Sequence, residues 1–135
     1  MTSRALPDPP VPVRLKLATL WASLMSCYIY GDYFGLYVPG KLQGMLNGEG
    51  PIGPSSEGTL VGVSLLLAVP ALMIALSVLL PARVCRVVTI ILGLFYALVM
   101  VVTMPGAWWF YKVLGVIEIA ISVVTVVVAW RWPKA

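Results

Sequence analysis

Residues 28–41 read Tyr-Ile-Tyr-Gly-Asp-Tyr-Phe-Gly-Leu-Tyr-Val-Pro-Gly-Lys and lie near the end of a long apolar run. An aspartate inside lipid costs about 2.5–3.5 kcal/mol on insertion scales, so Asp32 is expected to face protein or water. On a helix with about 100° per residue, the small and polar members share one side: Tyr28, Gly31, Asp32 and Gly35. The aromatic members share the opposite side: Tyr30, Tyr33, Phe34 and Tyr37. The segment therefore predicts a membrane helix with one face turned toward protein.

The composition of the whole chain supports a membrane location. The 135 residues are 61% hydrophobic and only 10% charged, with a mean hydropathy of +1.00. In a soluble domain roughly a quarter of the residues are charged. With so few charges here, we expect lipid to cover part of the protein's apolar surface. The net charge of +4 comes from basic residues at the ends of apolar runs rather than in one patch. We therefore expect one domain over residues 1–135, a lipid bilayer as its surroundings, and no nucleic-acid partner.

The cysteine and histidine content gives no indication of a metal or redox centre. The chain has two cysteines and no histidine. Cys27 is expected inside the first span and Cys85 in a loop, so neither a disulfide nor a Cys/His metal site is predicted. The sequence carries no recognisable cofactor motif, so we expect no cofactor and favour a protein that is not an enzyme.

Four apolar runs are long enough to cross the roughly 30 Å hydrocarbon layer as helices. The expected spans are residues 15–38, 58–80, 87–104 and 107–130, after a flexible proline-containing tail at 1–13. Residues 41–47 predict a short interfacial helix, and 48–56 a flexible loop. Pro70 predicts a kink in the second span, which requires a neighbouring helix to serve the carbonyl that the proline frees.

The distribution of basic residues predicts the orientation of this bundle. With four spans, seven of the nine Lys and Arg residues share one side: Arg4, Arg14, Lys16, Arg83, Arg86, Arg131 and Lys134. Lys41 and Lys112 fall on the other side. Positive loops stay inside, so both termini are expected to be cytoplasmic, with residues 81–86 as a tight basic turn. The expected fold class is an all-α integral membrane protein, a four-transmembrane-helix bundle with up-down-up-down topology and consecutive helices as antiparallel neighbours.

Three of the spans also carry a stripe of small and polar residues at helical spacing. In the second span the stripe is Thr59, Gly62, Pro70, Met73 and Ser77. In the third span it is Thr89, Gly93, Tyr96, Met100 and Thr103. In the fourth span it is Tyr111, Gly115, Glu118, Ser122 and Thr125. Such faces allow close helix approach and interhelical hydrogen bonds, so all four spans are expected to turn them to a common centre.

This centre predicts a ligand-binding site. Its expected members are Tyr28, Asp32, Tyr96, Tyr111, Glu118 and Ser122. Glu118, midway along the last span, is the strongest candidate, because Asp32 is near enough to the boundary to reach water. A Tyr28–Glu118 hydrogen bond and an Asp32–Lys112 ion pair are two hypotheses for its contacts. The alternative is that the tyrosines and hydroxyls only join helices, while Lys112 extends to the membrane surface.

Residues 21–45 read Trp-Ala-Ser-Leu-Met-Ser-Cys-Tyr-Ile-Tyr-Gly-Asp-Tyr-Phe-Gly-Leu-Tyr-Val-Pro-Gly-Lys-Leu-Gln-Gly-Met. This segment resembles the signature of an uncharacterised family of small bacterial four-span membrane proteins, and Pro70-Ala-Leu-Met73 and Leu79-Leu-Pro81 are similar too. More distantly the layout resembles the DoxX-like group, some members of which are associated with quinone or thiol redox systems. The resemblance implies a bacterial inner-membrane protein and implies no established activity.

Three functions are consistent with these features. The first is binding or transport of a small cationic or amphipathic ligand or a proton, with a homo-oligomer expected because four helices enclose little space. Small four-helix multidrug transporters use a membrane glutamate in this way, although theirs lies in the first span. The second is an accessory subunit of a membrane redox system that holds a quinone-like ligand. The third is a structural protein whose buried acids only specify helix pairing.

Overall fold

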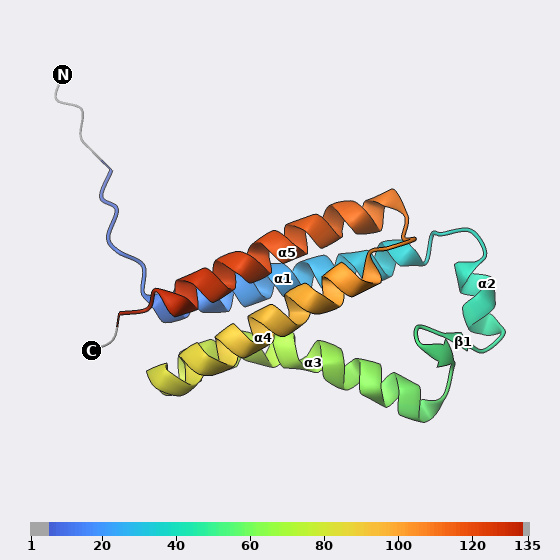
Figure 1. Cartoon of the computed structure of the whole chain (residues 1–135), viewed down its shortest axis with the longest axis horizontal. Helices are drawn as coiled ribbons and strands as arrows, with labels where there is room; N and C mark the ends of the chain where they lie inside the picture. The colour runs from blue at the N-terminus through green and yellow to red at the C-terminus, as the bar shows by residue number, and fades with distance from the viewer. Residues whose placement is uncertain (1–5, 134–135) are drawn as a thin grey trace, which may run out of the picture.

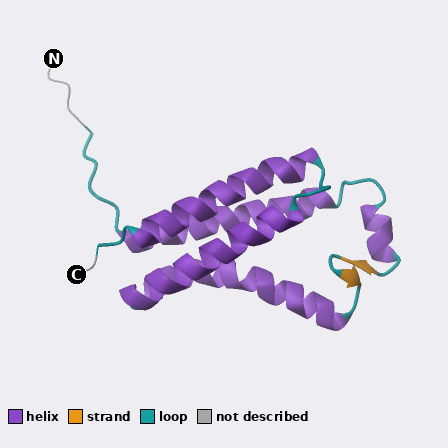
Figure 2. Ribbon diagram, viewed as in Figure 1, coloured by secondary structure: helices purple, strands orange, loops and turns teal. Residues whose placement is uncertain are grey.

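The computed structural model describes residues 6–133, which form five helices and one short hairpin (Figures 1 and 2). The long helices are α1 (Val13–Gly35), α3 (Glu57–Leu79), α4 (Ala82–Thr103) and α5 (Trp109–Trp130). The short elements are α2 (Lys41–Leu46), β1 (Glu49–Gly50) and β2 (Gly53–Pro54). The short helix expected after the first span is confirmed. The expected flexible loop instead contains an antiparallel hairpin that pairs Glu49 with Pro54 and Gly50 with Gly53.

The chain direction alternates along the long helices, so the start of α1 and the end of α5 lie at the same end of the bundle (Figure 1). Helix α1 packs against both α3 and α5, and α5 packs against α4. The consecutive helices α3 and α4 touch little, because they meet near the Pro81 connection and then diverge (Figure 1). The first and last helices are thus close neighbours, an arrangement that chain order alone does not predict.

Three helices, α3, α4 and α5, are long and apolar enough to cross a membrane. Helix α1 is as long as α3, at 23 residues, but it carries Arg14, Lys16 and Asp32 along with several hydroxyl residues. The outer faces of all four long helices expose large apolar side chains, among them Ile29, Leu65, Leu98 and Val116. An apolar exterior over this length is typical of a helical bundle surrounded by lipid.

The start of α4 differs from the expected boundary. The helix begins at Ala82, directly after Pro81, rather than at residue 87. Arg83 and Arg86 therefore lie in its first turns, and the expected basic turn is part of a helix. Cys85, expected in a loop, is fully buried against Leu17 and Ala129. The physical reason is that proline favours the position before or at the first helical residue, so Pro81 starts the helix earlier than the apolar run suggests.

Most of the inward stripes are confirmed by burial. The buried members are Pro70, Met73 and Ser77 of α3, Thr89, Gly93, Tyr96 and Met100 of α4, and Gly115, Glu118, Ser122 and Thr125 of α5. The residues toward the far end of the bundle depart from the expectation: Gly62 and Thr103 are exposed, and Thr59 and Tyr111 are half-buried. Helix α3 diverges from the other long helices at that end, which leaves its own residues there with fewer neighbours (Figure 1).

The kink-forming Pro70 lies inside α3, where it cannot donate a hydrogen bond to the carbonyl of Leu66. The Tyr96 hydroxyl of α4 donates to this carbonyl at 2.5 Å. The Tyr96 ring also packs edge-on against Trp21 of α1, with ring centroids 6.2 Å apart. The requirement that a neighbouring helix serve the freed carbonyl is therefore confirmed, and one side chain links three helices.

Two arginines join helix ends at the side of the bundle where the chain ends lie. Arg14 of α1 donates to the carbonyl oxygen of Val78 in α3 at 2.9 Å. Arg86 of α4 donates to the carbonyls of Ala129, at 3.1 Å, and Trp130, at 2.9 Å, in α5. The last carbonyls of a helix have no partner within it, and they carry a partial negative charge. Each arginine thus caps the C-terminus of an antiparallel neighbour.

Candidate ligand-binding centre

Five buried polar side-chain atoms make no hydrogen bond with any described residue. They belong to α5 and to the two helices that pack on it: Trp21 Nε1 and Tyr28 Oη of α1, Thr89 Oγ1 of α4, and Glu118 Oε2 and Ser122 Oγ of α5. Buried polar atoms in folded proteins are almost always hydrogen-bonded, and inside a membrane bulk water is absent. These unused donors and acceptors in the bundle interior make the region around them the candidate site.

Glu118 is the ionisable member of this group. Its side chain is only 2% exposed, and no described lysine or arginine pairs with it. Gly115 and Ser122, one turn away on each side, are also buried and keep this face of α5 narrow. A carboxyl group buried without a cation or hydrogen-bond donor is costly, and such a group in a membrane helix marks a functional site by default.

Tyr28 lies on α1, which packs along α5 in the region of Glu118: Gly31, one turn after Tyr28, is next to Leu114, one turn before Glu118. The expected Tyr28–Glu118 hydrogen bond is nevertheless absent, because each atom is without a partner. The Tyr28 ring packs on the Tyr96 ring, with centroids 6.0 Å apart, and this contact fixes where its hydroxyl points. The hypothesis of a direct bond is thus wrong for this structure, and both groups remain available to a third molecule.

The other two predicted tyrosines use their hydroxyls to join protein segments. Tyr96 donates to the carbonyl of Leu66, and Tyr111 donates to the Thr103 hydroxyl at 3.0 Å. The Tyr96 ring still contacts the Tyr28 ring. The structure therefore leaves Tyr28, Glu118 and Ser122 unpartnered on two helices that pack together, α1 and α5. Tyr96 contacts Tyr28, and Tyr111 is bonded to Thr103.

Asp32 lies one helical turn beyond Tyr28, near the end of α1. Its side chain is exposed and lines a groove of about 610 Å³ together with Lys41 and Glu49, between α1, α2 and the hairpin. The expected Asp32–Lys112 ion pair is wrong: the Lys112 ammonium instead lies 4.9 Å from the centre of the Trp109 ring. Trp109 and Lys112 are three positions apart, so they lie on the same face of α5 and the ammonium group can rest on the indole ring.

Sequence reasoning missed two members of the unpartnered group. Trp21 is fully buried in the core of the bundle, whereas the chain's other tryptophans stand near the ends of α5. A signal for it exists, because Trp21, Leu24 and Tyr28 continue the inward face of α1 at three- and four-residue spacing. Thr89 was expected on the inward stripe of α4 but was not assigned to the site.

Fold and site together define a small helical protein of membrane type with an acidic, incompletely hydrogen-bonded interior. The chain belongs to a family of unknown function, DUF6326, whose sequence model matches residues 13–135. Membership of an uncharacterised family is thereby confirmed. No curated protein and no solved structure matched the chain.

Proposed function

We propose that this chain is a four-span protein of the bacterial inner membrane that binds a small cationic or amphipathic ligand, or a proton, at Glu118. The observation that carries the proposal is the buried Glu118 oxygen without a partner among the described residues. The Ser122 hydroxyl, one turn further along α5, and the Tyr28 hydroxyl, on the neighbouring helix α1, are in the same condition. A structure whose only task was helix pairing would gain by joining these groups to one another, since each unmet hydrogen bond costs stability.

The proposal takes α1 as the fourth span. Its 23 residues reach about 34 Å at the helical rise of 1.5 Å per residue. It packs along α3 and α5, so a membrane crossed by those two helices also surrounds α1. Arg14, Lys16 and the arginines of α4 and α5 lie at the end where the chain ends lie, which supports a cytoplasmic location for that end. Arg4 and Lys134, expected on the same side, lie outside the described residues.

The chemistry of the centre favours a cation or a proton. A carboxylate attracts positive charge strongly where the dielectric is low. The faces of the Tyr28 and Tyr96 rings, packed together near it, add an attraction for organic cations. The same carboxyl can take up and release a proton, so exchange of one proton for one cation is the simplest transport step that this centre could support.

The unpartnered Tyr28 hydroxyl favours a second candidate, a quinone-like ligand held by an accessory redox subunit. A phenol hydroxyl donates readily to a carbonyl oxygen, and a second donor is present in Ser122. The DoxX-like layout of the chain supports this candidate by analogy of architecture alone.

The test is thermal unfolding of the detergent-purified full chain with tetraphenylphosphonium as the organic cation and decylubiquinone as the quinone. A ligand at 100 times its Kd stabilises the folded state by about 2.7 kcal/mol, which corresponds to a shift of several degrees in Tm for a chain of this size. We expect one of the two probes to raise Tm in the wild type and in the matched control Glu57→Gln, but not in Glu118→Gln. Equal shifts in wild type and Glu118→Gln, or no shift with either probe, would contradict the proposal.

A further inference from the structure

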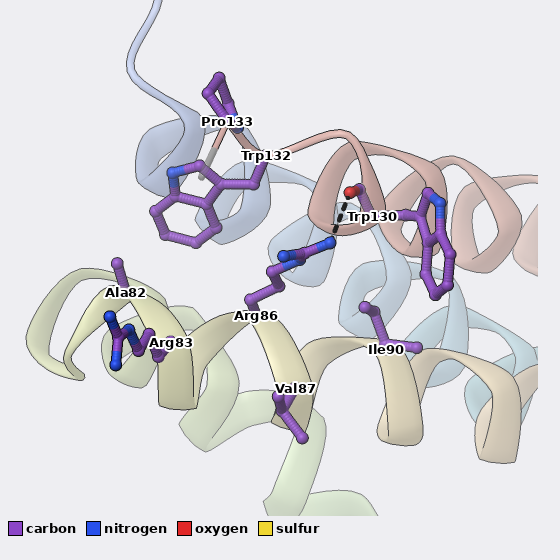
Figure 3. Close-up of a pocket in the computed structure, with 8 residues that line it drawn as sticks. All are labelled: Ala82, Arg83, Arg86, Val87, Ile90, Trp130, Trp132 and Pro133. Atoms are coloured by element: carbon purple, nitrogen blue, oxygen red, sulfur yellow. Dashed lines mark hydrogen bonds between the residues drawn. The ribbon is translucent and has the colours of Figure 1, made fainter. Parts of the chain in front are cut away.

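A second groove, of about 760 Å³, opens where the start of α4 meets the end of α5 (Figure 3). Its lining combines two arginines, two tryptophans and apolar side chains: Arg83, Arg86, Trp130, Trp132, Val87 and Ile90. It lies at the end of the bundle where the chain ends lie (Figure 1), far along α5 from Glu118. It is therefore distinct from the acidic centre.

The described side chains that line this groove carry positive charge only. Arg86 donates its Nε hydrogen and one Nη2 hydrogen to the carbonyls at the end of α5. The other three of its five guanidinium hydrogens are available to a ligand. Arg83, one turn earlier on the same helix, is exposed and makes no hydrogen bond within residues 6–133. None of the described residues that line the groove carries a carboxylate. The site is thus suited to an anion that needs several donors.

The rest of the lining is suited to a lipid. The Arg86 guanidinium lies between the indole rings of Trp130 and Trp132 (Figure 3), and tryptophan is the residue that membrane proteins place at the level of the headgroups. Beyond the arginines, the exposed side chains of α4 form an apolar face that consists of Val87, Ile91 and Leu94. The groove is therefore cationic at the membrane surface and apolar below it, as a phospholipid is anionic at its head and apolar in its chains.

We propose that this groove binds one anionic phospholipid. Its phosphate contacts the Arg83 guanidinium and the remaining hydrogens of Arg86, and its acyl chains lie along Val87 and Ile91. Guanidinium groups bind phosphate through paired, charge-assisted hydrogen bonds, so Arg83 contributes affinity that a diffuse positive charge does not. The proposal does not depend on what binds at Glu118.

The test is native mass spectrometry of the full chain released from detergent micelles that contain phosphatidylglycerol or phosphatidylcholine. Arg83→Gln removes the proposed phosphate contact without touching a protein hydrogen bond. Arg131→Gln is the matched control, because it removes the same charge at the same end of the bundle, directly after α5, but Arg131 does not line the groove. We expect one retained phosphatidylglycerol in the wild type, with affinity at least about tenfold lower in Arg83→Gln and nearly unchanged in Arg131→Gln. Unfolding curves of both variants check that they fold alike.

Four results would overturn the proposal. Equal retention in Arg83→Gln and wild type would remove Arg83 from the site. Equal losses in both variants would mean an effect of total charge. Equal retention of phosphatidylcholine would mean a general apolar groove. Displacement of the lipid by millimolar inorganic phosphate would mean a site for a free anion instead of a lipid.

Discussion

The Tyr96 hydroxyl donates a 2.5 Å hydrogen bond to the carbonyl of Leu66, the acceptor that Pro70 leaves without an intrahelical donor. Tyr96 is almost fully buried, and its ring contacts both Trp21 and Tyr28 of α1. The hydrogen bond that satisfies the Leu66 carbonyl of α3 thus also positions the Tyr96 ring, against which Tyr28 packs. The proline position in α3 and the packing around Tyr28 are thus linked through this one residue.

We therefore predict that Tyr96→Phe lowers the free energy of unfolding by about 1–2 kcal/mol, because it leaves the Leu66 carbonyl unsatisfied inside the bundle. Restoring a backbone donor with Pro70→Ala should make the same substitution less costly. Equilibrium unfolding of the wild type, the two single variants and the double variant in mixed micelles measures this coupling. Strictly additive effects of the two substitutions would show that Tyr96 does not serve the freed carbonyl.

The close approach of α4 and α5 depends on Gly93. A Cβ at this position would lie 2.6 Å from Cγ2 of Val126, and a β-branched side chain cannot rotate away without strain. We predict that Gly93→Ala destabilises the protein by about 1–3 kcal/mol, and that Val126→Ala in the same chain relieves much of this cost. Gly62→Ala is the control, because a Cβ there meets nothing within 4 Å. Unfolding midpoints that fall equally for both glycines would refute the close-packing account.

Removal of the Arg86 cap should loosen the end of α5. Arg86→Met leaves the Ala129 and Trp130 carbonyls without their donor, at an expected cost of about 1–3 kcal/mol for hydrogen bonds from a charged group. Arg86→Lys should recover only part of the loss, because an ammonium group cannot reproduce the planar fork. Hydrogen exchange of the last turn of α5 should quicken in Arg86→Met and stay unchanged in Arg131→Met. Unaltered exchange in Arg86→Met would show that the cap is not needed.

Much of this fold can be predicted from the sequence, since small and polar residues at three- and four-residue spacing identified the buried faces of α3, α4 and α5. The boundary of α4 could not, because hydropathy follows the apolar run whereas Pro81 sets the helix start. Its two arginines were consequently assigned to a turn, and the cap on α5 was missed.

The contacts within the site were harder to predict than its members. Whether the Tyr28 hydroxyl reaches Glu118 depends on the distance between α1 and α5 and on the position of the Tyr96 ring. The positions of the two residues along their spans predict neither of these. Lys112 was paired with Asp32 on depth alone, whereas a local contact with Trp109 on its own helix competes successfully. Trp21 was missed because tryptophan in a membrane protein suggests the interface first.

Glu118 offers a direct contrast between a functional and a structural role. If the carboxyl is kept for ligand binding, its burial without a partner destabilises the folded protein. We therefore predict that Glu118→Met, similar in length and apolar, is neutral or stabilises by up to about 3 kcal/mol while it abolishes ligand-induced shifts in Tm. Glu118→Gln retains polar atoms and should be less stable than Glu118→Met. A marked loss of stability in Glu118→Met would favour the structural role.

The most direct measurement is the reaction of the purified protein with dicyclohexylcarbodiimide, an apolar reagent that adds to carboxyl groups in apolar surroundings, followed by peptide mass spectrometry. We predict one adduct at Glu118, absent in Glu118→Gln, which forms more slowly when the stabilising cation or quinone is present. The exposed acids Asp32, Glu49 and Glu57 should remain largely unmodified. Labelling of those acids with Glu118 untouched, or labelling of Glu118 at a rate that neither probe alters, would contradict the claim that this carboxyl is available to bind a ligand.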